Sequence, residues 1–232
     1  MTRDYPGARA SSPQPFPNGR AVAPRSVFNP PRVLAILSVA AALSGCITLL
    51  PKSPPAQLYR FGATGPATAT PPTGARNFSV RDGPINFSAA SAGDQILTVD
   101  GEKTAYIAGA RWISSAAALF EAATDEAFAA RSGPARLLAR GETAHADYVL
   151  KLDVRRFEAR YDHGAASAPT IVVQVYAALD DPSRPAAGHD HVFAAAAPAS
   201  DNRVGAIVQA FDTALAAVLS DLTAWVDAKG EP

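Results

Sequence analysis

Residues 202–228 read NRVGAIVQAFDTALAAVLSDLTAWVDA, and this stretch decides the fold more than any other part of the chain. Its apolar residues recur at steps of three and four, which places them on one side of an α-helix. They are Val204, Ile207, Val208, Phe211, Leu215, Val218, Leu219, Leu222 and Val226. The preceding Ser200, Asp201 and Asn202 are typical N-cap residues. The sequence therefore predicts a long amphipathic helix whose apolar side needs a broad surface to cover.

Three segments upstream of this helix are predicted to be strands, and together they would form the surface that the helix covers. Residues 147–157 alternate apolar and charged side chains, and the alternation slips near Arg155-Arg156, which predicts a β-bulge. Residues 170–179 carry apolar side chains on both faces, a pattern typical of a central strand. Residues 190–196 predict a weaker third strand, because turn residues precede it.

The first part of the predicted domain consists of an extended segment and a hairpin. Residues 78–87 predict the extended segment, and order is expected to begin there. Apolar runs at residues 95–99 and 104–108 flank Asp100-Gly101. Since Asp-Gly between apolar runs is a strong hairpin signal, we expect the two runs to pair as antiparallel strands.

Residues 111–131 then change to helical spacing, with apolar side chains from Trp112 onward on one face. We expect a helix that opens at Arg111-Trp112 and stops at the Ser-Gly-Pro run of residues 132–134. Strands, helix, strands and helix follow one another without regular βαβ alternation. The sequence thus predicts an α+β fold, a two-layer sandwich in which two helices pack on one face of a mostly antiparallel, curved sheet.

The N-terminal part carries the features of an export signal. Residues 33–45 form an uncharged apolar run, shorter than the ~20 residues of a membrane-spanning helix but typical of a signal peptide. The run ends in Leu43-Ser44-Gly45 before Cys46, and this motif is similar to the lipobox that precedes an acylated cysteine. We therefore expect cleavage before Cys46 and acylation of its thiol. The alternative is a lone buried cysteine at the end of a core helix.

These features divide the chain into four parts. Residues 1–45 are expected to be an N-terminal extension and lipoprotein signal peptide. Residues 46–75, rich in proline, are expected to be the acylated cysteine and its tether. Residues 76–228 form the single α+β domain, and residues 229–232 a tail. Within the tether, residues 58–61 (Leu-Tyr-Arg-Phe) form a compact patch in which three of the four side chains are apolar, and they predict either an edge strand of the domain or an apolar linker.

The charge balance bears on the class of partner. The whole chain has 21 basic and 21 acidic residues, but five arginines and only one acid precede Cys46. The remaining chain therefore carries 16 basic and 20 acidic residues, a net charge of −4. Because an acidic domain repels phosphate backbones, we expect no nucleic-acid partner. The residue after the cysteine is Ile47 rather than aspartate, so by the sorting rule for lipoproteins we expect the outer rather than the inner membrane.

The chain offers little for catalysis or metal binding. His189 and His191 lie two apart, so a strand would point both imidazoles to one face. Two histidines without a third ligand at suitable spacing are a weak metal signal, and a solvated strand start is the favoured interpretation. No serine-nucleophile elbow, Walker A loop or dinucleotide-binding glycine motif occurs. We therefore expect neither an enzyme nor a bound cofactor or metal.

One basic cluster remains, formed by Lys151, Arg155, Arg156 and Arg160. Lys151 and Arg155 are expected to share the polar face of one strand, where they can contact lipid head groups or an acidic partner. The favoured alternative is a sheet face that simply contacts solvent.

The order of motifs resembles that of the ABC-type transport auxiliary lipoprotein family, which includes PqiC-like proteins. The similar stretches are Asp94–Leu97, Ala105–Trp112, Ala146–Glu158 and Ala210–Val226. The resemblance implies a non-enzymatic accessory of an envelope lipid-transport system. It implies an MCE-domain substrate-binding protein and an ABC permease and ATPase as partners, with docking to the MCE protein as the mechanism.

Two other functions stay open from the sequence. The domain can be a binding module that holds a lipid or hydrophobic solute between its sheet and long helix. The many alanines of the helices argue against a roomy cavity there. A weaker possibility is an envelope hydrolase that uses His189 or His191.

Overall fold

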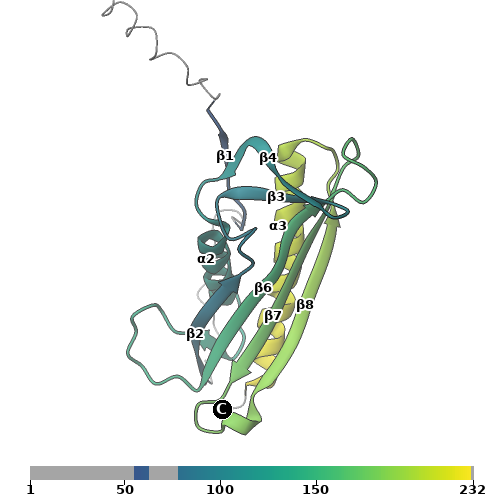
Figure 1. Ribbon diagram of the computed structural model, residues 1–232. Helices are drawn as coiled ribbons and strands as arrows, with labels where there is room; N and C mark the ends of the chain where they lie inside the picture. Colours follow the sequence, from purple (N-terminus) through teal and green to yellow (C-terminus); the bar gives the residue numbers. More distant parts are fainter. Residues whose placement is uncertain (1–54, 63–77, 231–232) are drawn as a thin grey trace, which may run out of the picture. The chain divides into compact units, whose positions relative to one another are not determined.

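A computed structural model describes residues 55–62 and 78–230, which belong to one compact unit, Pro54–Pro232 (Figure 1). The described residues form one eight-stranded sheet and two α-helices. The strands are β1 (Gln57–Tyr59), β2 (Phe78–Phe87), β3 (Gln95–Asp100), β4 (Lys103–Trp112), β5 (Ala135–Leu137), β6 (Tyr148–Arg160), β7 (Thr170–Asp180) and β8 (His189–Pro198). The helices are α2 (Ala116–Ala129) and α3 (Val204–Lys229), and a 3₁₀ turn, η2 (Pro185–Ala187), precedes β8.

Strand β6 organises the sheet. Along one side it pairs antiparallel with β7, which in turn pairs antiparallel with β8. Along its other side it pairs parallel with β2 near its start and parallel with β3 near its end. The β3–β4 hairpin is antiparallel, whereas β1 joins β4 and β5 joins β2 in parallel.

The predicted α+β sandwich is confirmed, and the sheet is mixed. A mostly antiparallel arrangement describes the β6–β7–β8 part well. The parallel pairs arise because β2 and β3 precede α2 and pair with β6, which follows that helix; such crossovers produce parallel neighbours. Figure 1 shows α3 lying along the sheet and α2 beside it.

The predicted bulge in β6 is confirmed. Val154 pairs with Val175 and Arg156 pairs with Gln174, so Arg155 is the extra residue between two regular ladders. The bulge keeps the apolar side chains of both halves of the strand on the helix-covered face.

The predicted Asp-Gly hairpin is also confirmed, with Gly101 at a φ of +58° in the turn. The first helix begins later than predicted, at Ala116, where the Ser115 hydroxyl accepts a hydrogen bond from the Ala118 N–H at 3.2 Å. Arg111 and Trp112 instead end β4, so their assignment to the helix start was wrong. Trp112 is buried because it lies on the inner face of β4. Its position four residues before the buried helix residue Ala116 gives the same sequence spacing as a helix turn.

Helix α3 confirms the prediction for the C-terminal segment, except at its N-cap. Arg203 occupies the cap position without a side-chain hydrogen bond. The predicted caps have other partners: Asp201 accepts from the Arg203 guanidinium, and Asn202 accepts from the Tyr161 hydroxyl. The helix is long and apolar enough to cross a membrane, but its apolar stripe lies against β7 and β8 in the core.

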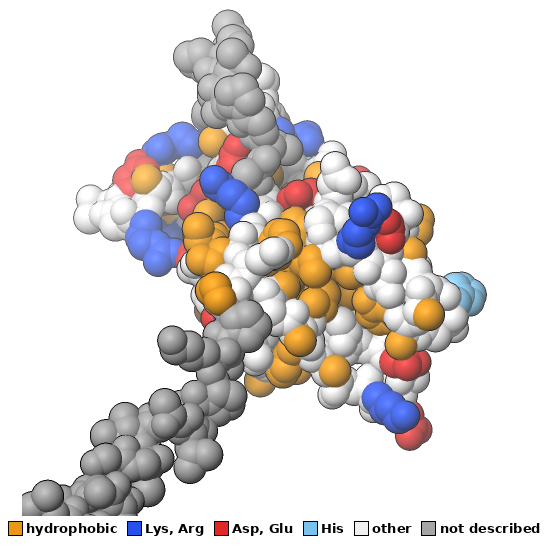
Figure 2. Space-filling view, turned by 90° about the horizontal axis from the view of Figure 1, so that it is seen from above, with side chains coloured by type: hydrophobic (Ala, Val, Ile, Leu, Met, Phe, Trp, Pro, Cys, Tyr) orange, Lys and Arg blue, Asp and Glu red, His pale blue; other side chains and the backbone are white. Residues whose placement is uncertain are grey.

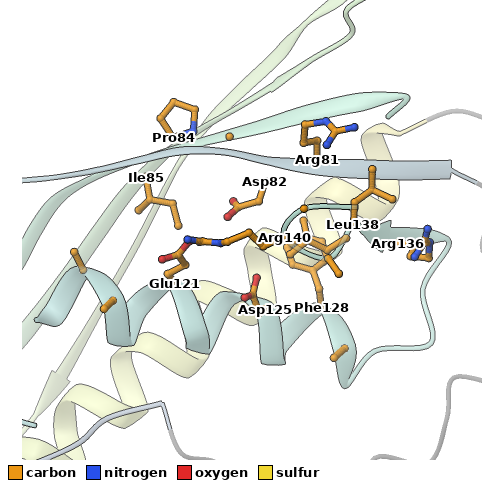
Figure 3. A pocket seen from close by; sticks show the side chains of 17 residues that line it. Arg81, Asp82, Pro84, Ile85, Glu121, Asp125, Phe128, Arg136, Leu138 and Arg140 are labelled. Carbon is orange, nitrogen blue, oxygen red and sulfur yellow. The ribbon is translucent and has the colours of Figure 1, made fainter. Parts of the chain in front are cut away.

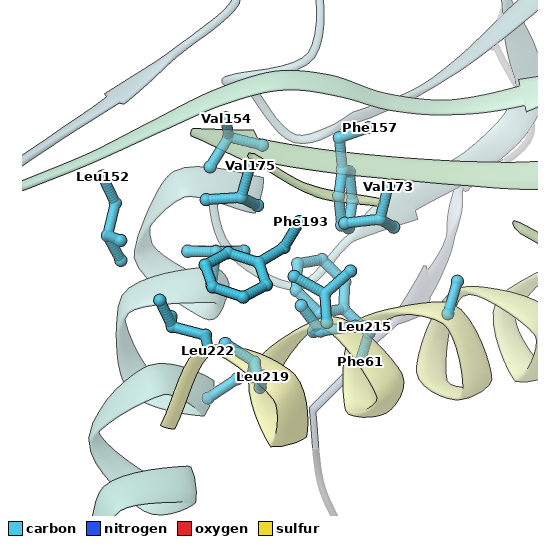
Figure 4. Close-up of a cluster of buried hydrophobic side chains, with 14 of the residues drawn as sticks. Phe61, Leu152, Val154, Phe157, Val173, Val175, Phe193, Leu215, Leu219 and Leu222 are labelled. Carbon is cyan, nitrogen blue, oxygen red and sulfur yellow. The ribbon is translucent and has the colours of Figure 1, made fainter. Parts of the chain in front are cut away.

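The core between sheet and α3 is centred on aromatic side chains (Figure 4). The Phe61 ring lies 4.8 Å from the Trp112 ring and 4.9 Å from Phe157, measured between centroids. Phe211 on α3 lies 4.8 Å from Phe157. Phe61 belongs to the segment for which the sequence left a strand and a linker open. The structure shows that β1 is an edge strand and that Phe61 behind it fills the core.

Gly62 ends this docked segment. Its N–H donates a hydrogen bond of 2.8 Å to the Asp212 carboxylate on α3. Its φ is +75°, and a Cβ there would lie 2.6 Å from the Ala123 Cβ, so glycine is required. The segment is thereby fixed to both helices.

Candidate functional site

A cleft of about 880 Å³ opens between β2, α2 and the segment after β5 (Figure 3). Along this cleft β2 is irregular between Asp82 and Ile85, where its register against β6 shifts. Gly83 permits the shift, since a Cβ there would lie 2.7 Å from the Leu150 carbonyl oxygen. The walls combine apolar side chains, such as Ile85 and Phe128, with charged ones.

The charged residues that line this cleft include Asp82, Glu121, Asp125 and Arg140, and Figure 3 shows their side chains between β2 and α2. Glu121 on α2 forms a salt bridge with Arg140. Asp82 and Asp125 face each other without a salt bridge to any described residue, and the Asp82 Oδ1 atom is buried without a hydrogen-bond partner. Burial raises the pKa of Asp82, the negative charge of Asp125 raises it further, and Arg140 lowers it. Burial also raises the pKa of Asp125.

Paired carboxyls with raised pKa values in a cleft can hold a proton or attract a cationic group. The residues lining this cleft include no histidine, serine or cysteine, and its ionisable groups are carboxylates and guanidinium groups. The sequence did not point to Asp82 and Asp125; Asp82-Gly83-Pro84 signals only a break in the strand, and the approach of α2 is a tertiary feature.

A smaller groove of about 320 Å³ runs between α2 and α3. Its floor consists of small and aliphatic side chains, including Ala123, Ala127 and Leu215, and Glu126 and Asp212 lie among the polar lining residues. Burial raises the pKa of Asp212, whereas the hydrogen bond from the Gly62 N–H lowers it.

The predicted basic cluster lies on the sheet face opposite the helices. Lys151 and Arg155 share that face, and each is paired with an acid: Lys151 Nζ lies 2.7 Å from Asp180, and Arg155 Nε lies 3.1 Å from Asp153. The Arg155 guanidinium also stacks over the Tyr176 ring at 4.6 Å from its centroid. The cluster is therefore locally neutralised and is not a patch of free positive charge.

Two further members complete the cluster. Arg156 is exposed and forms no salt bridge with any described residue. Arg160 pairs with Asp162 at 2.9 Å. Arg156 is thus the cluster's available cation.

The two candidate metal-binding histidines lie at the exposed start of β8. The His191 ring contacts Phe193 at 4.7 Å and lies stacked near Trp225 at 6.4 Å between centroids. Residues 55–62 and 78–230 contain no group of three or more His, Cys, Asp or Glu side chains arranged to hold a metal ion. Cys46 and the lipobox residues Leu43, Ser44 and Gly45 lie outside the described residues.

Comparisons with known proteins show which family this chain is similar to. The family model of the ABC-type transport auxiliary lipoprotein component matches residues 59–223. A search of curated proteins gives no match.

Two solved structures share the fold. The protein XCC0632 from Xanthomonas campestris is 24% identical, with a TM-score of 0.62 over 75% of this chain and 96% of that one. An uncharacterised protein of known structure is 10% identical, with a TM-score of 0.58 over 75% of this chain and 99% of that one. The family match spans nearly all of the described domain, from the end of β1 into the last turns of α3. The chain belongs to the family of ABC-type transport auxiliary lipoprotein components.

Proposed function

We propose that this chain is a lipid-anchored accessory of an ABC/MCE-type envelope lipid-transport system, held by acylated Cys46 and facing the periplasm. The family match over residues 59–223 carries the proposal, since that family is a transport auxiliary component and not an enzyme family. The lipobox-like Leu43-Ser44-Gly45 and Ile47 support an anchor in the outer membrane. The residues between Cys46 and β1 serve as the tether, and the domain acts by docking to the MCE-domain protein, which links it to the permease and ATPase.

The filled core supports docking over lipid carriage between the sheet and α3. Phe157 and Phe211 are at most 2% exposed, and Leu222 is fully buried (Figure 4). A lipid would have to displace these side chains, each of which contributes about 2 kcal/mol by its burial.

The exposed face of β6 and β7 is the docking surface that we propose. It presents Arg156 and the Arg155–Tyr176 stack on a rigid, fully paired part of the sheet. Arginine and tyrosine are enriched at protein interfaces, because they combine apolar contact area with hydrogen-bonding groups.

Site-specific photocrosslinking tests the docking. A photoreactive amino acid replaces Arg156, and for comparison Gln209 on the exposed side of α3, in cells that also produce the MCE-domain protein of the same organism. We expect a crosslink to the MCE-domain protein from position 156 and not from position 209. Equal yields at both positions, or none at position 156 when the complex co-purifies, would exclude this face as the docking surface.

One observation favours the alternative, a lipid-binding module. The cleft at Asp82 and Asp125 is large enough, at about 880 Å³, for part of an amphiphile. Native mass spectrometry of the purified protein separates the two functions, because a carrier retains a stoichiometric lipid and an adaptor does not.

A further inference from the structure

Two exposed aliphatic side chains lie side by side where the described domain begins. Leu58 on β1 and Ile113 just after β4 are each 61% exposed, which is unusual for large aliphatic residues. Leu58 pairs in register with Arg111, and the Ile113 N–H continues the ladder with a 2.7 Å hydrogen bond to the Tyr59 carbonyl. Leu58 and Arg111 are register partners on neighbouring strands and therefore share one face, and exposed Arg60 and Ile113 follow them two residues later along the same two segments. We call these four residues the tether-proximal patch.

The patch combines apolar and cationic groups. Arg111 is paired with Asp94 at 2.9 Å. Arg60 is exposed and forms no salt bridge with the residues that the structure describes. Aliphatic side chains beside an unpaired arginine match the lipid–water interface, where the former enter the acyl boundary and the latter contacts anionic head groups. Figure 2 looks down on this end of the molecule, where hydrophobic side chains are exposed among isolated charged ones.

The length of the chain ahead of β1 brings this patch to the bilayer. Leu58 lies twelve positions after Cys46 in the sequence. Even fully extended, a chain of twelve residues reaches no farther than about 40 Å. Since an acyl group on Cys46 lies in the bilayer, the patch is confined near the surface at an effective concentration in the millimolar range.

The opposite end of the domain is held farther away. Gly62, close to the patch in sequence, is bonded to Asp212 on α3, whereas Gly230 at the end of that helix lies against Phe78. The eighteen residues from Asp212 to Gly230 correspond to about 27 Å of helix. The tether therefore favours one end of the molecule for membrane contact, and that end carries the patch.

We infer that the tether-proximal patch lies against the membrane surface and sets the orientation of the domain on the bilayer. The inference rests on the proposed anchor at Cys46. The partner of the patch is lipid: Leu58 and Ile113 contact the acyl chains, and Arg60 contacts the head groups. The face of β6 and β7 proposed for docking remains available to a partner protein.

Depth-dependent fluorescence quenching tests the inference on the full lipidated protein. Acylation occupies the chain's only cysteine thiol, so Ile113→Cys supplies one free thiol for an environment-sensitive dye. Leu58→Cys is a second reporter, and Ala228→Cys, exposed near the end of α3, is the matched control. Each labelled protein is reconstituted into vesicles of phosphatidylethanolamine and phosphatidylglycerol that contain nitroxide-labelled lipid.

We expect dyes at positions 58 and 113 to be quenched at least about twofold more than the dye at position 228. Equal quenching at all three positions, while the protein floats with the vesicles, overturns the inference and leaves the anchor intact. A dye at position 113 that is shielded from water but not quenched by lipid indicates a protein contact and also overturns it. If the protein does not float with the vesicles, the result contradicts the proposed anchor at Cys46 as well as the inference that rests on it.

Discussion

At the scale of single residues, the carboxyl group of Asp82 lies in an environment that disfavours its negative charge. One of its carboxylate oxygens is buried without a hydrogen-bond partner, and Asp125 faces it across the cleft. Burial and this neighbour raise the pKa of Asp82 above the ordinary value near 3.8. The folded protein then binds the proton more tightly than the unfolded chain. Its contribution to stability is complete below the ordinary pKa and is lost as the pH rises through the raised pKa.

Asp82→Asn is therefore expected to stabilise the protein at neutral pH. The gain should be below about 1 kcal/mol, because solvent screens a half-exposed carboxyl, and should raise the melting temperature by about 2 °C. The loss of stability as the pH rises from 3.8 through the raised pKa of Asp82 should become smaller. Thermal unfolding followed by circular dichroism across this range measures both effects.

Asp94→Asn is the matched control, because Asp94 is exposed and pairs with Arg111. It should leave the melting temperature unchanged or slightly lower. A variant at Asp82 that behaves like the control would show that its carboxyl is well solvated.

Residues placed by strand alternation were predictable from the sequence, whereas residues placed by contacts between distant elements were not. Alternation along a strand was sufficient to place Lys151 and Arg155 on one face. Their acidic partners were harder to predict, because Asp180 comes from the neighbouring strand β7. Asp82 and Asp125 meet only because α2 packs beside the irregular part of β2, and neither periodicity nor spacing encodes that contact.

At the scale of secondary-structure elements, the bulge in β6 predicts that deletion of Arg155 destabilises the protein much less than deletion of Lys151 does. Arg155 is the extra residue, so its deletion should join the two ladders into one regular strand and keep Val154 and Phe157 inside. The loss should be about 1 kcal/mol, from the stack on Tyr176 and the salt bridge to Asp153. The protein is expected to fold.

Deletion of Lys151 is the matched comparison, because it too is an exposed basic residue on the outer face of β6. No bulge lies at that position, so the side chains on one side of the deletion must turn to the opposite face. Either Leu150 becomes exposed or Asp153 becomes buried, at a cost of several kcal/mol. Urea unfolding of both variants measures the difference. Equal stability of the two deletion variants would contradict the assignment of the bulge to Arg155.

Long elements were predictable and short ones were not. Residues 202–228 and 170–179 carry enough periodic side chains to identify α3 and β7. Strand β5 has three residues, and it exists only because β2 lies beside it. The start of α2 was misplaced because Trp112, at the end of β4, happens to lie four residues before the helix residue Ala116.

At the scale of the whole molecule, a rigid domain is joined to a short apolar edge strand that docks by Phe61. This side chain is 3% exposed and touches Trp112 and Phe157 of the core, so the chain ahead of it leaves the domain at a fixed point. With the proposed anchor at Cys46, a pull on the chain ahead of β1 acts on this strand, which is held by its ladder with β4 and by the Gly62–Asp212 hydrogen bond. In that proposal, attachment and fold are mechanically connected but chemically separate.

That separation predicts the behaviour of Cys46→Ser. Cys46 lies eleven residues ahead of β1 in the sequence, and Phe61, Trp112 and Phe211 build the core without it. The variant should therefore keep the melting temperature of the domain and lose membrane association, because a serine hydroxyl cannot replace the thiol in acylation. Fractionation of cells into soluble and membrane material, with circular dichroism of the purified variant, measures both quantities. If the variant stayed on the membrane after leader cleavage, the domain's own surface would be sufficient for attachment. If instead its melting temperature fell by several degrees, Cys46 would contribute to the fold itself, and the anchor would not be a separate part of the molecule.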